Sequence, residues 1–129
     1  MEHTLTATLE PYQKYITLKF NGDISADKLE GFKKDLEYAE KLITENYKEK
    51  HQKLHILLDM ANFSGTYNVE SLNALVEFAK QNKPYVEKTA SFGGSIKVKM
   101  AGEIAIALSD RDNIKMFNTK IDAIEWLLS

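Results

Sequence analysis

The 129-residue sequence contains no cysteine, only two prolines and a single arginine, and it has no long apolar run. Without cysteine, the chain can form no disulfide, thiolate metal site or cysteine nucleophile. Its apolar runs fall far short of the roughly 20 residues that span a bilayer. Residues 1–4 show no cationic region followed by an apolar segment, as a signal peptide would. We therefore expect a cytoplasmic protein without an integral membrane segment.

Neither sign of charge is in large excess, because the formal net charge is only -2. Of the 17 basic residues, only Arg111 is an arginine, whereas nucleic-acid binders usually carry a basic excess with arginines for phosphates and base edges. Nucleic acid is therefore not an expected partner. The composition, 43% hydrophobic and 28% charged, is that of a globular protein, and the length fits one domain over residues 1–129.

The first part of the chain predicts a hairpin and a long helix. Residues 4–9 alternate between apolar and threonine side chains, and a second alternation places Ile16, Leu18 and Phe20 on one face. Residues 10–13, which include Pro11, predict the turn between these strands. We expect residues 21–23 to end the second strand and Ser25 to cap a helix. Its buried face recurs at helical spacing: Leu29, Phe32, Leu36, Ala39 and Ile43.

The second part of the chain alternates strands with helices. A mostly apolar strand over residues 54–59 is followed by a predicted loop over residues 62–67. Asn68 is expected to cap a helix that Pro84 ends, with an apolar stripe that starts at Val69. The next elements are a strand over residues 89–92, a helix from Ser95 to about Leu108, and a strand over residues 113–117. Thr119 is expected to cap a last helix with this buried face: Ile121, Ile124, Leu127 and Leu128.

The predicted order is therefore β-β-α-β-α-β-α-β-α. Strands that alternate with helices imply right-handed crossovers and a parallel sheet. We predict an α/β fold with a mixed, mostly parallel five-stranded sheet, four helices and an N-terminal β-hairpin at one edge. That edge strand could pair with a second copy of the chain in a homodimer.

Three segments resemble a known family. These are residues 56–65, the strand Thr89-Ala90-Ser91-Phe92-Gly93, and residues 113–127 with their closing Glu-Trp-Leu. Together they are similar to the SpoIIAA-like (STAS-type) domains, especially their small stand-alone bacterial branch. The resemblance implies a β-α superhelix and a regulatory or ligand-binding role, as in anti-sigma-factor antagonists. Members of the broader superfamily resemble lipid-binding CRAL-TRIO domains, which keeps an apolar ligand open.

The resemblance also implies where a phosphorylation switch would lie. Regulatory members are phosphorylated on a serine of an Asp-Ser-Ser-Gly stretch that follows the central strand. The corresponding stretch here begins Phe63-Ser64-Gly65 and lacks that motif, although Ser64, Thr66 and Ser71 supply hydroxyl groups. The phosphoswitch is therefore not expected to be retained.

Polar and glycine residues follow two of the predicted strands. Asp59, Asn62 and Ser64 follow the central strand, and Gly93, Gly94, Ser95 and Lys97 follow the next one. Glycines and a helix N-terminus with nearby lysines can bind an anion, although the P-loop spacing is missing. A tight glycine turn and local Asx turns are the favoured interpretations. If the chain binds a ligand or a partner through its loops, this edge of the sheet is the expected place.

Other groups of residues do not predict a catalytic or metal site. His51 and His55 straddle a helix end and a strand start, so their spacing does not predict a metal site. Asp110 and Asp112 flank Arg111 in a predicted turn and are expected to solvate it rather than act as acid and base. Trp126 is expected to pack in the core, and Met60, Met100 and Met116 could make an apolar pocket adaptable. We expect no catalytic residue, metal or cofactor.

Three functional hypotheses remain, and the last of them is an enzyme whose site the sequence does not show. The first is a non-enzymatic regulatory or protein-interaction domain that works through the loops after the central strand and the one that follows it. The second is a carrier that binds an apolar or anionic, lipid-like molecule between the sheet and the second and third helices.

Overall fold

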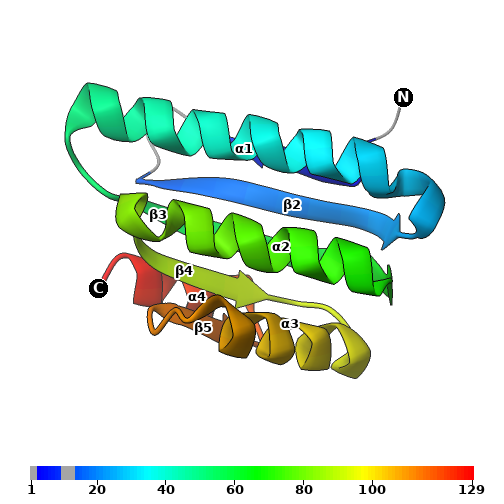
Figure 1. The fold of residues 1–129 in the computed structure, drawn as a ribbon. Coiled ribbons are helices and arrows are strands. Elements are labelled where there is room, and N and C mark those ends of the chain that lie inside the picture. Colours follow the sequence, from blue (N-terminus) through cyan, green and yellow to red (C-terminus); the bar gives the residue numbers. More distant parts are fainter. Residues whose placement is uncertain (1–2, 10–13) are drawn as a thin grey trace.

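The computed structural model describes residues 3–9 and 14–129, except for the side chains of residues 65–67. Five strands form one sheet in the order β1-β2-β3-β4-β5 (Figure 1). The first pair, β1 (Leu5–Thr8) and β2 (Tyr15–Ile24), is antiparallel. The remaining pairs are parallel and add these strands: β3 (Leu54–Tyr67), β4 (Val86–Phe92) and β5 (Ile114–Phe117). The predicted fold class is confirmed, while the predicted turn at residues 10–13 lies outside the described residues.

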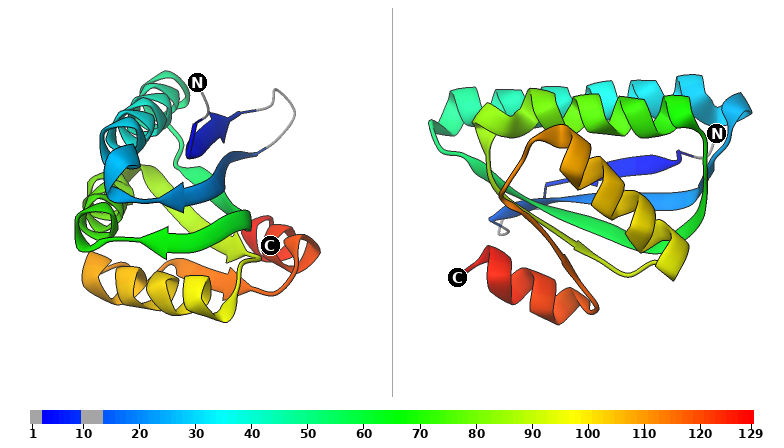
Figure 2. Two further views of the ribbon diagram at one scale, coloured as in Figure 1. Left: turned by 90° about the vertical axis from the view of Figure 1, so that its right-hand side faces the viewer. Right: turned by 60° about the horizontal axis from the view of Figure 1, so that its bottom comes forward.

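The helices cover the two faces of the sheet unequally. One face carries α1 (Leu29–Lys50), α2 (Val69–Asn82) and α3 (Ile96–Ser109), and the other carries α4 (Lys120–Leu127) (Figure 2). Short 3₁₀ turns, η1 (Ala26–Lys28) and η2 (Lys83–Tyr85), precede α1 and β4. Among the described residues, none of the helices combines the length and apolar character that crossing a bilayer requires.

The larger core lies under the three helices because alternate strand residues point to that face. Ile16, Leu18 and Phe20 of β2 are buried there against Phe32 and other residues of α1. The predicted buried face of this helix is therefore confirmed. The smaller core lies on the opposite face and joins strand residues such as Leu57 and Ala90 to Ala123 and Leu127 of α4.

Three predicted helix caps are present. Asn68 Oδ1 accepts a hydrogen bond from the Ser71 backbone N–H at 2.8 Å, while the Asn68 N–H donates to the Ser71 hydroxyl, which completes a capping box. Ser95 and Thr119 accept from the N–H groups of residues 98 and 122. These bonds satisfy amides that a helix start leaves without partners.

Two predicted strand ends are wrong. Strand β2 continues through residues 21–23 to Ile24, and β3 continues from Asp59 through the predicted loop to Tyr67. The two extensions pair with each other across irregular register, with Asn21 opposite Asn62. Strand β4 ends at Phe92, opposite Asp59, so β3 has only β2 as a neighbour beyond that point. Backbone pairing therefore sustains a strand where side-chain pattern predicted a loop.

Several helix details also differ from prediction. Ser25 precedes η1 and makes no side-chain cap bond there, and its hydroxyl hydrogen-bonds the carboxylates of Asp23 and Asp27. Val69 is exposed at the start of α2, and Phe78 is buried instead. In α4 the buried residues are Ala123 and Leu127, four residues apart, so Ile121 and Leu128 point away from the sheet and are exposed.

Candidate functional site

The polar residues at the carboxyl ends of β3 and β4 are largely engaged in local structure. Asp59 Oδ1 accepts a hydrogen bond from the Ala61 N–H at 3.0 Å, which forms an Asx turn. Ser95 caps α3, whereas Asn62, Ser64 and Lys97 are exposed. Register places Asp59 opposite Phe92, beside the glycine turn, but Asn62 lies opposite Asn21, on the β2 side. The structure therefore places Asp59 beside the end of β4 that precedes Gly93, and it pairs Asn62 with β2.

The Gly93-Gly94 turn has a clear structural cause. Both residues have positive φ, +80° and +89°. A Cβ atom at Gly93 would lie 3.0 Å from the backbone N and Cα of Ala61, and one at Gly94 would lie 2.7 Å from Val98. Only glycine fits such positions without strain. This turn lets β4 pass close to β3 and enter α3.

The candidate phosphorylation residues lie in different surroundings. Ser64 is exposed on β3, and the Thr66 side chain lies outside the described residues. Ser71 is buried, and its hydroxyl donates to the Asn68 carbonyl oxygen within the capping box.

His51 and His55 lie at different elements of secondary structure. His51 has a positive φ at the end of α1, while His55 lies within β3. Burial lowers the pKa of His55, and the charge of Lys88 lowers it further. In the part of the chain that the structure describes, no group of three or more His, Cys, Asp or Glu side chains is arranged to hold a metal ion.

Helix α3 carries its large apolar residues on the outside. Ile96, Met100, Ile104 and Leu108 follow one another at four-residue intervals and are between 47% and 79% exposed. We call these four residues the α3 outer stripe. The residues of α3 that face the sheet include the small Ala101, Gly102 and Ala105. A helix with small inward residues cannot fill the space between itself and the sheet.

A cavity of about 90 Å³ occupies that space, between the sheet and helices α2 and α3. We call it the sheet–helix cavity. Its walls are mainly apolar and include Met60 of β3 and Met116 of β5. A second cavity of about 50 Å³ shares five lining residues with it, namely Phe20, Met60, Leu75, Val98 and Gly102.

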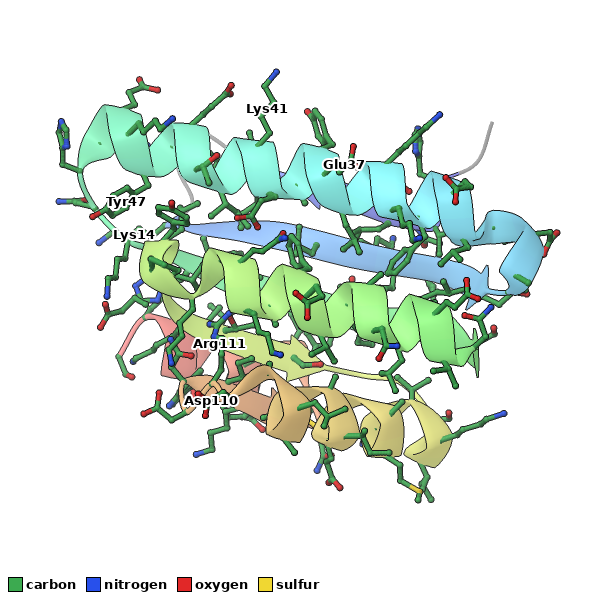
Figure 3. All side chains as sticks on the ribbon, in the orientation of Figure 1. Lys14, Glu37, Lys41, Tyr47, Asp110 and Arg111 are labelled. Atoms are coloured by element: carbon green, nitrogen blue, oxygen red, sulfur yellow. The ribbon has the colours of Figure 1, made fainter. Side chains whose placement is uncertain are left out.

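The polar lining of the sheet–helix cavity consists of Asn82, Thr89, Ser91 and Arg111. Arg111 is only 6% exposed and lies between the C-terminal part of α2 and the end of α3 (Figure 3). Its Nε donates to Asn113 Oδ1, its Nη1 to Asn82 Oδ1 and the Ala79 carbonyl, and its Nη2 to Thr89 Oγ1. Arg111 therefore links α2, β4 and the segment before β5.

The acceptors around Arg111 are all neutral. Within the described residues, no carboxylate forms an ion pair with it. Burial lowers the pKa of the guanidinium, which the charge of Asp112 partly offsets. The expectation that Asp110 and Asp112 solvate Arg111 in a turn is thus wrong, because the side chain turns inward and both carboxylates are exposed.

This architecture matches a known family. The sequence profile of SpoIIAA-like proteins matches residues 15–128. The chain belongs to the SpoIIAA-like family. Among solved structures, an uncharacterised DUF3478-family protein of Shewanella loihica PV-4 with a SpoIIAA-like fold is similar, with a TM-score of 0.63 and 15% identity over 95% of this chain and 91% of that one. The protein TM1081, solved by NMR, has a TM-score of 0.60 and 17% identity over 99% and 91% of the two chains.

At these identities the two structures show that the SpoIIAA-like fold is shared, and nothing about activity. No curated protein sequence matches the chain significantly. The feature that sequence reasoning missed in this SpoIIAA-like chain is the burial of Arg111 at the cavity. One signal pointed to it, because Arg111 is the single arginine among 17 basic residues, and arginine suits buried positions better than lysine.

Proposed function

We propose that this SpoIIAA-like domain binds a small, largely apolar molecule in the sheet–helix cavity. The observation that carries the proposal is the cavity itself, about 90 Å³ with mainly apolar walls and four polar residues. Binding sites for small molecules typically combine apolar walls with a few polar groups that orient the ligand. The cavity lies between the sheet and α2 and α3, where the carrier hypothesis placed its ligand.

The cavity can accept a ligand larger than its present volume if the side chains of its walls move. A water molecule needs roughly 10–15 Å³ of such space, and an engineered dry cavity of about 150 Å³ binds benzene. Met60 and Met116 have unbranched, flexible side chains, so they can move to enlarge a space of 90 Å³. The adjoining cavity of 50 Å³ gives a longer ligand room to extend toward Phe63 and Ser71.

Methionine methyl signals in NMR spectra test this proposal within one molecule. Met60 and Met116 line the cavity, whereas Met100 lies on the α3 outer stripe. On titration with hexan-1-ol, we expect the signals of Met60 and Met116 to shift with saturation while that of Met100 stays unchanged. Native mass spectrometry of protein purified from its own host should in addition reveal a co-purifying small molecule. Shifts confined to Met100, or none at Met60 and Met116, would contradict the proposal.

A matched pair of glycine variants separates binding in the cavity from binding elsewhere. A Cβ atom at Gly102 would lie 3.4 Å from the Met116 methyl carbon, so Gly102→Leu directs a side chain into the cavity. Gly31 lies in α1 with nothing within 4 Å of its Cβ position, so Gly31→Leu makes the same change on the surface. We expect Gly102→Leu to abolish the saturable shifts at Met60 and Gly31→Leu to preserve them.

The α3 outer stripe favours a second candidate function, binding of a protein partner in a regulatory role. Four large apolar side chains in line on one helix are typical of an interaction surface rather than of scattered exposed residues. The double variant Met100→Lys/Ile104→Lys should lose a partner captured from host extract, while Gly102→Leu should keep it. Capture that is equal with the wild type and the double variant would rule out this surface.

A further inference from the structure

We infer that the molecule bound in the sheet–helix cavity carries one carboxylate group and that Arg111 binds this group. The inference rests on the cavity binding proposed above and names the class of ligand: an amphiphile with an apolar body and a single carboxylate. Three observations support it: the position of the polar residues in the cavity, an N–H group of Arg111 without an acceptor among the described residues, and the neutral acceptors around the guanidinium.

The polar lining residues come from neighbouring parts of the structure. Arg111 contacts Asn82 at the end of α2 and Thr89 on β4, and Ser91 follows two residues later on the same face of β4. The remaining lining side chains, such as Leu58, Ile106 and Ile114, are apolar. A ligand that matches these walls has an apolar body and one polar end, which lies against Arg111.

Arg111 retains a donor for that polar end. A guanidinium has five N–H donors. In the described part of the chain, Nε uses its one proton on Asn113, Nη1 uses two on Ala79 and Asn82, and Nη2 uses one of two on Thr89. The second Nη2 proton is therefore available to an acceptor in the cavity, and the Ser91 hydroxyl lines the same space. A carboxylate can accept from both groups, since each of its oxygens has two acceptor positions.

Charge favours a carboxylate over both a neutral group and a phosphate. Arg111 is buried among neutral acceptors, and a buried charge without an opposite charge is unfavourable. A monoanion neutralises it, and hydrogen bonds between charged groups are about twice as strong as neutral ones. A phosphate monoester carries about -1.5 to -2 at neutral pH and would leave excess negative charge near Asp110 and Asp112. The single charge of one carboxylate therefore neutralises the single charge of the guanidinium.

The bonds of Arg111 to Ala79 and Asn82 also explain why it stays in place without a ligand. The Ala79 carbonyl belongs to the last turn of α2, where a helix leaves carbonyl groups without partners and where positive charge is favoured. Both contacts use Nη1, and Nε is held separately by Asn113, so these bonds fix the plane of the guanidinium and leave one Nη2 proton for the ligand. A donor held in advance loses little conformational entropy when it binds.

The test compares two probes of the same length, hexanoate and hexan-1-ol, on the unmodified protein at neutral pH. Binding is followed by the methyl signals of Met60 and Met116, and the headgroup by the Nε–H signal of Arg111, which is the sole arginine and so cannot be confused with another. We expect hexanoate to bind at least about tenfold more tightly than hexan-1-ol, as a charge-assisted hydrogen bond allows. Hexanoate, and not hexan-1-ol, should shift the Arg111 signal strongly.

Two variants that each remove one positive charge complete the test. Arg111→Gln should abolish the preference for hexanoate. Lys83→Gln should preserve it, because Lys83 is exposed and donates to the Asp110 carbonyl outside the cavity. If Arg111→Gln does not fold, the comparison of probes on the unmodified protein still decides the question. Equal affinity for both probes would overturn the role of Arg111 and leave the cavity proposal standing. Absence of saturable shifts with either probe would overturn both.

Discussion

Gly93 lies just beyond the β3–β4 ladder, where the chain passes close to the backbone of β3. Its φ is +80°, and a Cβ atom at this position would lie 3.0 Å from the backbone N and Cα of Ala61, which leaves no room for a side chain. We expect Gly93→Ala to lower the free energy of unfolding by about 1–3 kcal/mol, the usual cost of holding a non-glycine residue in an unfavourable backbone region. Urea denaturation measures the change.

Gly31→Ala is the control for this substitution, because Gly31 lies in α1 with open space around it. Replacement of a helical glycine by alanine is expected to raise stability by up to about 1 kcal/mol. A neutral Gly93→Ala variant, beside a stabilised Gly31→Ala variant, would show that the turn can relax away from Ala61.

Glu40 is a second residue whose surroundings make a prediction. One of its carboxylate oxygens is buried without a hydrogen-bond partner among the described residues, and burial raises its pKa above the ordinary 4.5. The folded protein therefore holds this proton more strongly than the unfolded chain, so stability falls as the pH rises above about 4.5. We expect Glu40→Gln to increase stability at pH 7 and to have a smaller effect below pH 4.5.

The neighbouring Glu37, exposed on the same helix and labelled in Figure 3, is the control. Glu37→Gln removes the same charge without removing a buried one, so its effect should be small at both pH values. Denaturation curves at the two pH values distinguish the variants. A gain at neutral pH that is as large for Glu37→Gln as for Glu40→Gln would point to the net charge rather than to burial.

At the scale of the element, the start of α2 depends on a reciprocal pair of hydrogen bonds. Asn68→Ala removes the acceptor of the Ser71 N–H and should lower the free energy of unfolding by about 1 kcal/mol. Asn68→Ser keeps a side-chain acceptor and should restore most of this loss. Thermal unfolding monitored by circular dichroism measures both variants, and equal losses would mean that the cap contributes nothing.

Helix α3 shows what the sequence could not predict about an element. Its start followed from the Ser95 cap and the glycines before it, and this start is confirmed. Its orientation did not follow, because large and small apolar residues occur all around it and no polar face marks the solvent side. Packing against α2 and the sheet therefore decides that Gly102 and Ala105 face inward, and the cavity results from that choice.

At the scale of the whole molecule, the mostly parallel sheet with a hairpin at its edge was predictable, because strands that alternate with helices imply parallel pairing. The extended ends of β2 and β3 were not, since they depend on pairing between segments far apart in sequence. Burial of Arg111 likewise depends on Asn82, Thr89 and Asn113, which the fold brings together from three segments. Local patterns thus predicted the framework of the fold, and long-range contacts created the candidate site.

The sheet–helix cavity also affects how this protein responds to hydrostatic pressure. Pressure favours the state of smaller volume, and unfolding eliminates internal voids such as the 90 Å³ cavity. We expect Gly102→Leu, which fills the void, to unfold at higher pressure than Gly31→Leu, with fluorescence of the sole tryptophan, Trp126, as the measurement. A bound ligand should raise the unfolding pressure of the unmodified protein in the same way. The unfolding pressure therefore reports whether the cavity is occupied.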